Sequence, residues 1–154
     1  MKRKRFQNIS QTLPMKTLFV DTDIIIDLLA KREPYFDDTV KLFTLAEEDK
    51  LKLYSSAISF AAVNYVLLKE KQPSEAKLIL RQLKLIVKIA NLNEEIVNLA
   101  ANDLNSMDFK DALQYHSALY NRMDFFITRN LSSFKKSQIP VMTPEQFLNG
   151  VNPI

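Results

Sequence analysis

Cysteine, glycine and histidine are nearly missing from this chain of 154 residues, which has no cysteine, one glycine and one histidine. Without cysteine there can be no disulfide, no thiol nucleophile and no thiolate zinc site. The single His116 argues against Ser-His-Asp chemistry and excludes a multi-histidine metal site within one chain. The single Gly150 lies near the C-terminus, which excludes a Walker loop and the glycine fingerprint of dinucleotide-binding folds. Any catalysis must therefore depend on carboxylates, for which Mg²⁺ or Mn²⁺ are the natural partners.

Long apolar runs and a strong overall charge are missing as well. No run reaches the roughly 18 residues of a membrane span and nothing reads as a secretion signal, so we expect a cytoplasmic protein without membrane contact. Four basic residues lie at positions 2–5, whereas positions 15–154 carry 17 basic and 18 acidic side chains. We expect residues 1–14 to be a basic N-terminal extension outside the fold. It is either an arm that contacts nucleic acid or, as we favour, an upstream extension of the reading frame. Residues 15–150 then form a single domain.

Apolar periodicity predicts alternating strands and helices. Strands are predicted at 17–20, 51–54, 85–90, 125–128 and 140–142. Helices are predicted at 23–31, for three turns from Phe36, after Ser55-Ser56, at 74–84, after Asn93, at 106–120 and after Thr143. This alternation indicates an α/β fold, a three-layer α/β/α sandwich around a mostly parallel sheet of about five strands. Side chains expected to face the core from the helix after Ser56 are Ile58, Ala61, Ala62, Tyr65 and Val66, and Tyr115 and Tyr120 are expected in the core as well.

The first acidic cluster follows the first predicted strand. Asp21 lies at the carboxyl end of that strand, where open α/β sheets place their ligand crevice. Aspartate suits a helix cap better than a strand interior, so Asp21 and Asp23 are either a cap plus a spare acid or part of a cation site. We expect Asp23 to cap the next helix and Asp27 to be structural. Asp21 is then left without a structural role, which favours chemistry for it.

The second acidic cluster, Asp108-Phe109-Lys110-Asp111, opens the predicted helix 106–120. Asp108 can cap this helix, whereas nothing local demands Asp111. We expect His116 to be a hydrogen-bonded, partly buried residue and not a ligand. The apolar face of the helix is expected to consist of Phe109, Ala112, Leu113, His116 and Tyr120, with Asp108, Asp111 and Tyr115 on a stripe beside it.

Five segments, taken in their order along the chain, carry a resemblance to a known family. They are Asp21 to Asp27 after a strand, Ser56 to Ser59 opening a helix, Asp108 to Asp111, Ile127 to Asn130, and Ile139 to Phe147. In this order and spacing, from about Met15 to Leu148, the chain resembles the PIN domain, and within it the VapC-type toxins of bacterial toxin–antitoxin pairs. The resemblance implies a Mg²⁺- or Mn²⁺-dependent endoribonuclease that cuts RNA with a metal-activated water. It also implies a small antitoxin protein as partner and a homodimer, in whose contact the aromatics Tyr35 and Phe36 could lie.

Residue by residue, the resemblance implies a metal held by Asp21, Asp111 and the accessory Asp108. Asn130 would complete the catalytic set at the position of a further family acid. The residues expected to surround and support these acids are Thr128, Asp23 and Ser59. The candidate RNA contacts are Arg129, Arg32 and Lys31. Lys135 and Lys136 are expected to be solvated surface charges.

Two acids of the family pattern are missing from this chain. The glutamate of the helix after Ser56 falls at Ala62, and Asn64, about 200° around the helix, should not replace it. The fourth acid appears as Asn130, and Ser133 is not an acid either. An amide oxygen can still hold a metal-bound water, but it carries no charge. We therefore expect weak metal binding without substrate and a nuclease activity that is low or depends on Mn²⁺.

Two other functions are consistent with the residues. A catalytically eroded PIN domain that acts as a binding or scaffold module is supported by Ala62 and Asn130, and opposed by the three retained acids. A haloacid-dehalogenase-type phosphatase is a distant third. Asp21-Thr22-Asp23 resembles its Asp-x-Asp motif, but Phe126 to Asn130 supplies no later acidic pair.

Overall fold

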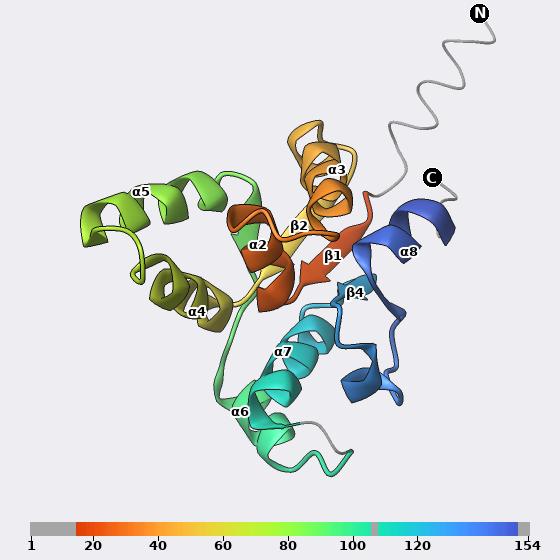
Figure 1. Ribbon diagram of the computed structural model, residues 1–154. Helices are drawn as coiled ribbons and strands as arrows, with labels where there is room; N and C mark the ends of the chain where they lie inside the picture. The colour runs from red at the N-terminus through yellow and green to blue at the C-terminus, as the bar shows by residue number, and fades with distance from the viewer. Residues whose placement is uncertain (1–14, 106–107, 151–154) are drawn as a thin grey trace, which may run out of the picture.

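A parallel sheet of five strands forms the centre of the structure, a computed structural model that describes residues 15–105 and 108–150 (Figure 1). The strands are β1 (Thr17–Val20), β2 (Lys52–Ser55), β3 (Val87–Ile89), β4 (Phe125–Ile127) and β5 (Val141–Met142). Their order is β3-β2-β1-β4-β5, and each neighbouring pair is parallel. The predicted α/β sandwich is confirmed. Because the chain continues to opposite sides of the central β1, the carboxyl end of β1 is a topological switch point, where such sheets form their ligand crevice.

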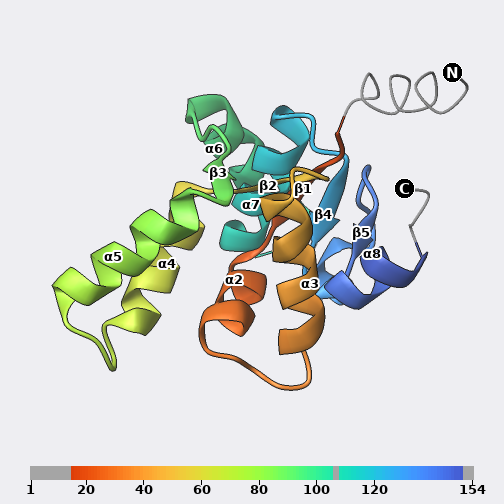
Figure 2. The same ribbon diagram turned by 90° about the horizontal axis from the view of Figure 1, so that it is seen from above.

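Helices cover both faces of this sheet. They are α2 (Thr22–Leu29), α3 (Phe36–Glu47), α4 (Ala57–Leu67), α5 (Pro73–Lys84), α6 (Glu94–Ala101), α7 (Phe109–Tyr120) and α8 (Pro144–Gly150), with a 3₁₀ turn at Leu131–Phe134. Figures 1 and 2 show α6 and α7 on the side of the sheet opposite α2 and α3.

Alternation along β1 builds a core on each side of the sheet. Leu18 and Val20 belong to a core cluster that also contains buried residues of α2, α3, α4, α5 and α8. Phe19 faces the other way and stacks on Phe126 of β4, with ring centroids 5.4 Å apart. The strand that carries Asp21 is therefore buried on both faces, as expected for the centre of a parallel sheet. Among the described residues no helix is long and apolar enough to cross a membrane.

The buried face of α4 differs from the prediction. Its buried residues are Ser59, Val63 and Leu67, while Tyr65 is 70% exposed. The helix is apolar nearly all round, so periodicity alone could not choose the face that α2 and α5 cover. On α7, Tyr115 is buried as expected, but Phe109 and Tyr120 are exposed. The predicted first turn of α7 at 106–107 and the extension 1–14 lie outside the described residues.

Candidate active site at the carboxyl edge of the sheet

Asp21 is the buried acid at the end of β1, and it caps α2. Its Oδ1 accepts a hydrogen bond from the Thr22 amide at 2.9 Å, so the prediction that Asp23 is the cap is wrong: the helix begins directly after the strand. Gln114 Nε2 donates to the same oxygen at 3.3 Å, and Thr128 Oγ1 donates to Oδ2 at 3.0 Å. We expected no structural role for the Asp21 side chain. Three donors nevertheless hold its carboxylate, and the residue is only 6% exposed.

Asp111 lies in the first turn of α7, partly buried. Burial raises the pKa of its carboxyl, and the negative charges of Asp108 and Asp21 raise that pKa further, while Lys110 and a hydrogen bond from Ser133 oppose the shift. The influence of Asp21 means that acids from the two sequence clusters lie close enough to interact. Within residues 15–105 and 108–150, neither Asp21, Asp108 nor Asp111 forms an ion pair with a lysine or arginine.

Asp108 is the N-cap of α7, because its Oδ1 accepts the Asp111 amide at 2.7 Å. In the part of the chain that the structure describes, no three acids or histidines are grouped so that they could hold a metal ion. The acids that remain are Asp21 and Asp111, and the charge of Asp21 raises the pKa of Asp111. One Mg²⁺ or Mn²⁺ ion held by one or two carboxylates, water and substrate phosphate fits such a donor set, whereas a pair of ions does not.

Thr128 and Asn130 connect β4 to this pair of acids. The Thr128 hydroxyl accepts the Asn130 amide at 3.1 Å while it donates to Asp21. The Asn130 side chain donates to Ser133 Oγ at 2.6 Å, and Ser133 in turn hydrogen-bonds to Asp111. Asn130, at the position where the resemblance expects an acid, is therefore neutral and is linked to Asp21 and Asp111 only through Thr128 and Ser133.

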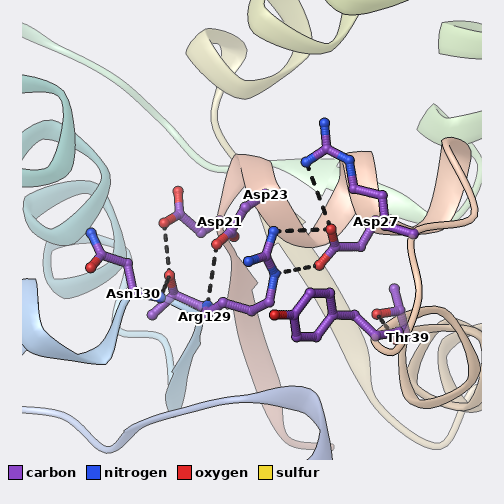
Figure 3. Close-up of polar contacts among 9 residues, drawn as sticks. Asp21, Asp23, Asp27, Thr39, Arg129 and Asn130 are labelled. Atoms are coloured by element: carbon purple, nitrogen blue, oxygen red, sulfur yellow. Dashed lines mark hydrogen bonds and ion pairs between the residues drawn. The ribbon is translucent and has the colours of Figure 1, made fainter.

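Asp27 and Arg129 form a buried ion pair beside the site (Figure 3). Arg129 donates from Nε to Asp27 Oδ2 at 2.7 Å and from Nη2 to Oδ1 at 3.1 Å, and its guanidinium lies 4.1 Å from the Tyr35 ring centroid. The hydrogen bond to Asp27 raises the pKa of Arg129. The Arg129 amide donates to Asp23 Oδ2 at 3.3 Å, and this hydrogen bond lowers the pKa of Asp23. Burial and the charge of Asp21 outweigh it and raise that pKa to about 6.

The other predicted residues lie around these groups. Ser59 does not contact Asp21; its hydroxyl is 2.8 Å from Thr22 Oγ1 and accepts from Gln114 at 2.6 Å. Arg32 approaches Asp27 at 3.9 Å. Lys31, Lys135 and Lys136 are exposed. His116 is hydrogen-bonded to Asp103 at 2.7 Å and partly buried, as expected.

Gln114 is the functional candidate that sequence reasoning missed. It is fully buried on α7, three residues after Asp111. The signal that could have identified it is a long polar side chain in the middle of a helix that the fold buries. Glutamine is rarely buried without a specific hydrogen-bond partner, so such a position indicates a polar contact.

The fold, the acids at the end of β1 and the Thr128 turn together define a class of protein, and a sequence model of the PIN domain matches residues 17–132. The chain belongs to the PIN domain family. It is 28% identical over 138 residues to ribonuclease VapC1 of Aquifex aeolicus, an alignment that covers 88% of this chain and 95% of that protein.

Solved structures share the fold. VapBC-1 from nontypeable Haemophilus influenzae matches with a TM-score of 0.63 and 18% identity over 84% of this chain and 98% of that chain. A toxin–antitoxin complex from Klebsiella pneumoniae matches with a TM-score of 0.62 and 24% identity over 82% of this chain and 97% of that chain.

Proposed function

We propose that this protein is a metal-dependent endoribonuclease of the PIN/VapC type, with an activity reduced by the two missing acids. The observation that carries the proposal is that α7, which bears Asp111 in its first turn, reaches Asp21 through the Gln114 amide at 3.3 Å. The charge of Asp21 acts on the Asp111 carboxyl, and neither acid is ion-paired with a lysine or arginine of the described residues. The relative VapC1 supports RNA as the substrate.

A divalent ion would be held by Asp21 and Asp111, with Asp108 and Asn130 as accessory groups. When bound, such an ion lowers the pKa of a bound water and stabilises negative charge on the scissile phosphate. The chain's own part is to orient the Asp21 carboxylate, which the Thr22 amide and the Thr128 hydroxyl do by donating to opposite oxygens. Asp111 must lose its proton to act as a ligand, so its raised pKa moves the onset of metal binding to higher pH.

Arg32 and Lys31 remain the candidate RNA contacts. Arg32 has a side chain 47% exposed and only a long contact with Asp27, so it is available for a phosphate. Arg129 is already paired with Asp27, and its role as an RNA contact stays a prediction.

A comparison of the wild type with Asp21→Asn tests the enzymatic proposal. RNA cleavage is followed over time with Mn²⁺ or Mg²⁺ added, and Asp37→Asn, an exposed acid in the first turn of α3, is the matched control. We expect Asp37→Asn to cleave like the wild type and Asp21→Asn to fall to background. Equal cleavage by Asp21→Asn would refute the proposal. RNA binding without cleavage at any metal concentration would favour the eroded binding module.

We also propose a small antitoxin protein as partner, because the solved neighbours from Haemophilus and Klebsiella are toxin–antitoxin complexes. A groove of about 280 Å³ between α2 and α4 suits an apolar helix face. Its lining includes the apolar Ile26, Leu29, Val63 and Val66 and the charged Arg32, Lys69, Glu70 and Lys71. Co-purification with the product of an adjacent small reading frame is expected for the wild type and lost in Val66→Glu. Retained binding by that variant would exclude this groove.

A homodimer stays a prediction, to be tested by light scattering.

A further inference from the structure

Gln114 lies at the centre of a buried hydrogen-bond network that the proposed chemistry does not yet use. Its Nε2 donates to Asp21 Oδ1 at 3.3 Å and to Ser59 Oγ at 2.6 Å. Its Oε1 accepts from Ser56 Oγ, and Ser59 Oγ also contacts Thr22 Oγ1. Gln114, Ser56 and Ser59 are all fully buried. One side chain of α7 therefore joins the starts of α2 and α4 to the central acid.

The chemistry of its neighbours fixes the orientation of the Gln114 amide. A carboxylate can only accept hydrogen bonds, so the NH₂ group must face Asp21. The reverse orientation would direct the carbonyl oxygen at the carboxylate and would leave a buried donor without that acceptor. Ser56, the N-cap of α4, supplies a hydroxyl to the other end of the amide.

The donors around Asp21 leave a defined part of its carboxylate free. A carboxylate offers about four lone-pair positions. Oδ1 accepts from the Thr22 amide and from Gln114, and Oδ2 accepts from Thr128. Both positions on Oδ1 are used, so the remaining position is on Oδ2. An ion at this site can bind Asp21 through one oxygen only.

We infer that Gln114 is a positioning residue: it holds Oδ1 of Asp21 and so presents the free position of Oδ2 to the metal. This inference rests on the proposed function. The bonds to Ser56 and Ser59 are enough for a structural role, whereas the bond to Asp21 is made to a carboxylate that the proposed function needs. Partners that hydrogen-bond to a ligating carboxylate commonly change metal affinity by about 10–100-fold when removed.

The experiment measures Mn²⁺ affinity of the full-length chain without RNA, by titration calorimetry and by the electron paramagnetic resonance signal of free Mn²⁺. Gln114→Met keeps the side-chain size and removes the donor to Asp21. The control Ser117→Ala removes another buried hydrogen bond of α7, from Ser117 Oγ to the Asn91 carbonyl at 3.1 Å, away from Asp21. Gln114→Asn, which keeps the amide but shortens its reach, serves if the Met variant does not fold by circular dichroism.

We expect Gln114→Met to bind Mn²⁺ about 10–100-fold more weakly than the wild type, and Ser117→Ala to stay within about threefold. Unchanged or tighter binding by a folded Gln114 variant would overturn the inference and leave the proposed function intact. An equal loss in Ser117→Ala would also overturn it, because the effect would then be general to α7. Wild-type protein that binds Mn²⁺ no better than Asp21→Asn would overturn the inference, and RNA cleavage by these two proteins would then decide the proposed function separately.

Discussion

Replacement of Asp27 by asparagine is the sharpest test of how the site is supported. Asp27 is fully buried and holds Arg129 through two hydrogen bonds, at 2.7 and 3.1 Å. The Arg129 backbone follows Thr128, which donates to Asp21, so the ion pair anchors the turn that shapes the site. Asp27→Asn keeps the shape and one acceptor oxygen but removes the negative charge.

The expected loss of stability is about 3 kcal/mol. Removing one partner of a buried ion pair costs about 3–5 kcal/mol, because the other charge is left without compensation. The side chain of Arg129 is 27% exposed, so water partly hydrates its stranded charge, and the remaining asparagine oxygen keeps one hydrogen bond. Both facts place the loss at the lower end of that range. For a chain of this size the melting temperature should fall by about 6–12 °C.

Urea unfolding at pH 7, followed by circular dichroism, gives the free energy of unfolding for the wild type, Asp27→Asn, Arg129→Met and the double variant. The double-mutant cycle should yield a coupling energy of about 2 kcal/mol. Asp37→Asn controls for the loss of one acid. A cost below about 1 kcal/mol with coupling near zero would refute the reasoning. Arg129 would then be free to bind RNA, the role that the sequence left open.

Three further predictions concern neighbouring residues. The pKa of Asp23, about 6, lies above its ordinary value of 3.8, so the protonated form contributes stability that is present below pH 4 and lost as pH rises through 6. Asp23→Asn should therefore be more stable than the wild type by about 1–3 kcal/mol at pH 7.5 and equal near pH 4 in urea unfolding; an unchanged difference across this range would contradict the argument. Phe126→Ala should cost about 3–5 kcal/mol by the same assay, because Phe126 is buried between Phe19 and Phe134; a cost below 1 kcal/mol would show that the core refills the space. Ser133→Asp places an acid beside Asp111 and should tighten Mn²⁺ binding roughly tenfold while it lowers metal-free stability; weaker binding would place the ion elsewhere.

The sequence was sufficient to locate the central acid because two local signals agree there. A short apolar run followed by aspartate marks the end of a buried strand, and the alternation of strands and helices places that end at the edge of a parallel sheet. The start of the helix predicted after Thr143 was equally local, because Thr143 and Gln146 form a capping box there. Thr143 Oγ1 accepts the Gln146 amide at 3.1 Å, and Gln146 Oε1 accepts the Thr143 amide at 3.0 Å.

The rest depends on contacts between distant segments. Asp23 and Asp21 both suit a helix cap, and only the length of β1 decides that Asp21 is the one. Whether the Arg129 side chain faces solvent or Asp27 depends on how the turn at Thr128 packs against α2. These two segments are far apart in the sequence, so no local pattern contains this contact. Gln114 escaped notice for the same reason, because its three partners, Asp21, Ser56 and Ser59, come from two other segments of the chain.

The two missing acids and the intact support of Asp21 have different consequences for the rate. Asp21 is fixed by donors that need no metal, so the geometry of the first ligand is built before an ion arrives. The charge that attracts the ion is reduced, since neutral Asn130 and Ser133 stand beside Asp111. In the proposed ribonuclease, metal occupancy, and not misplacement of the acids, should therefore limit cleavage. A rate that rises with Mn²⁺ concentration and then saturates would agree with this, whereas a rate that stays at background when the ion is saturating would mean that the site has lost catalysis as well as charge.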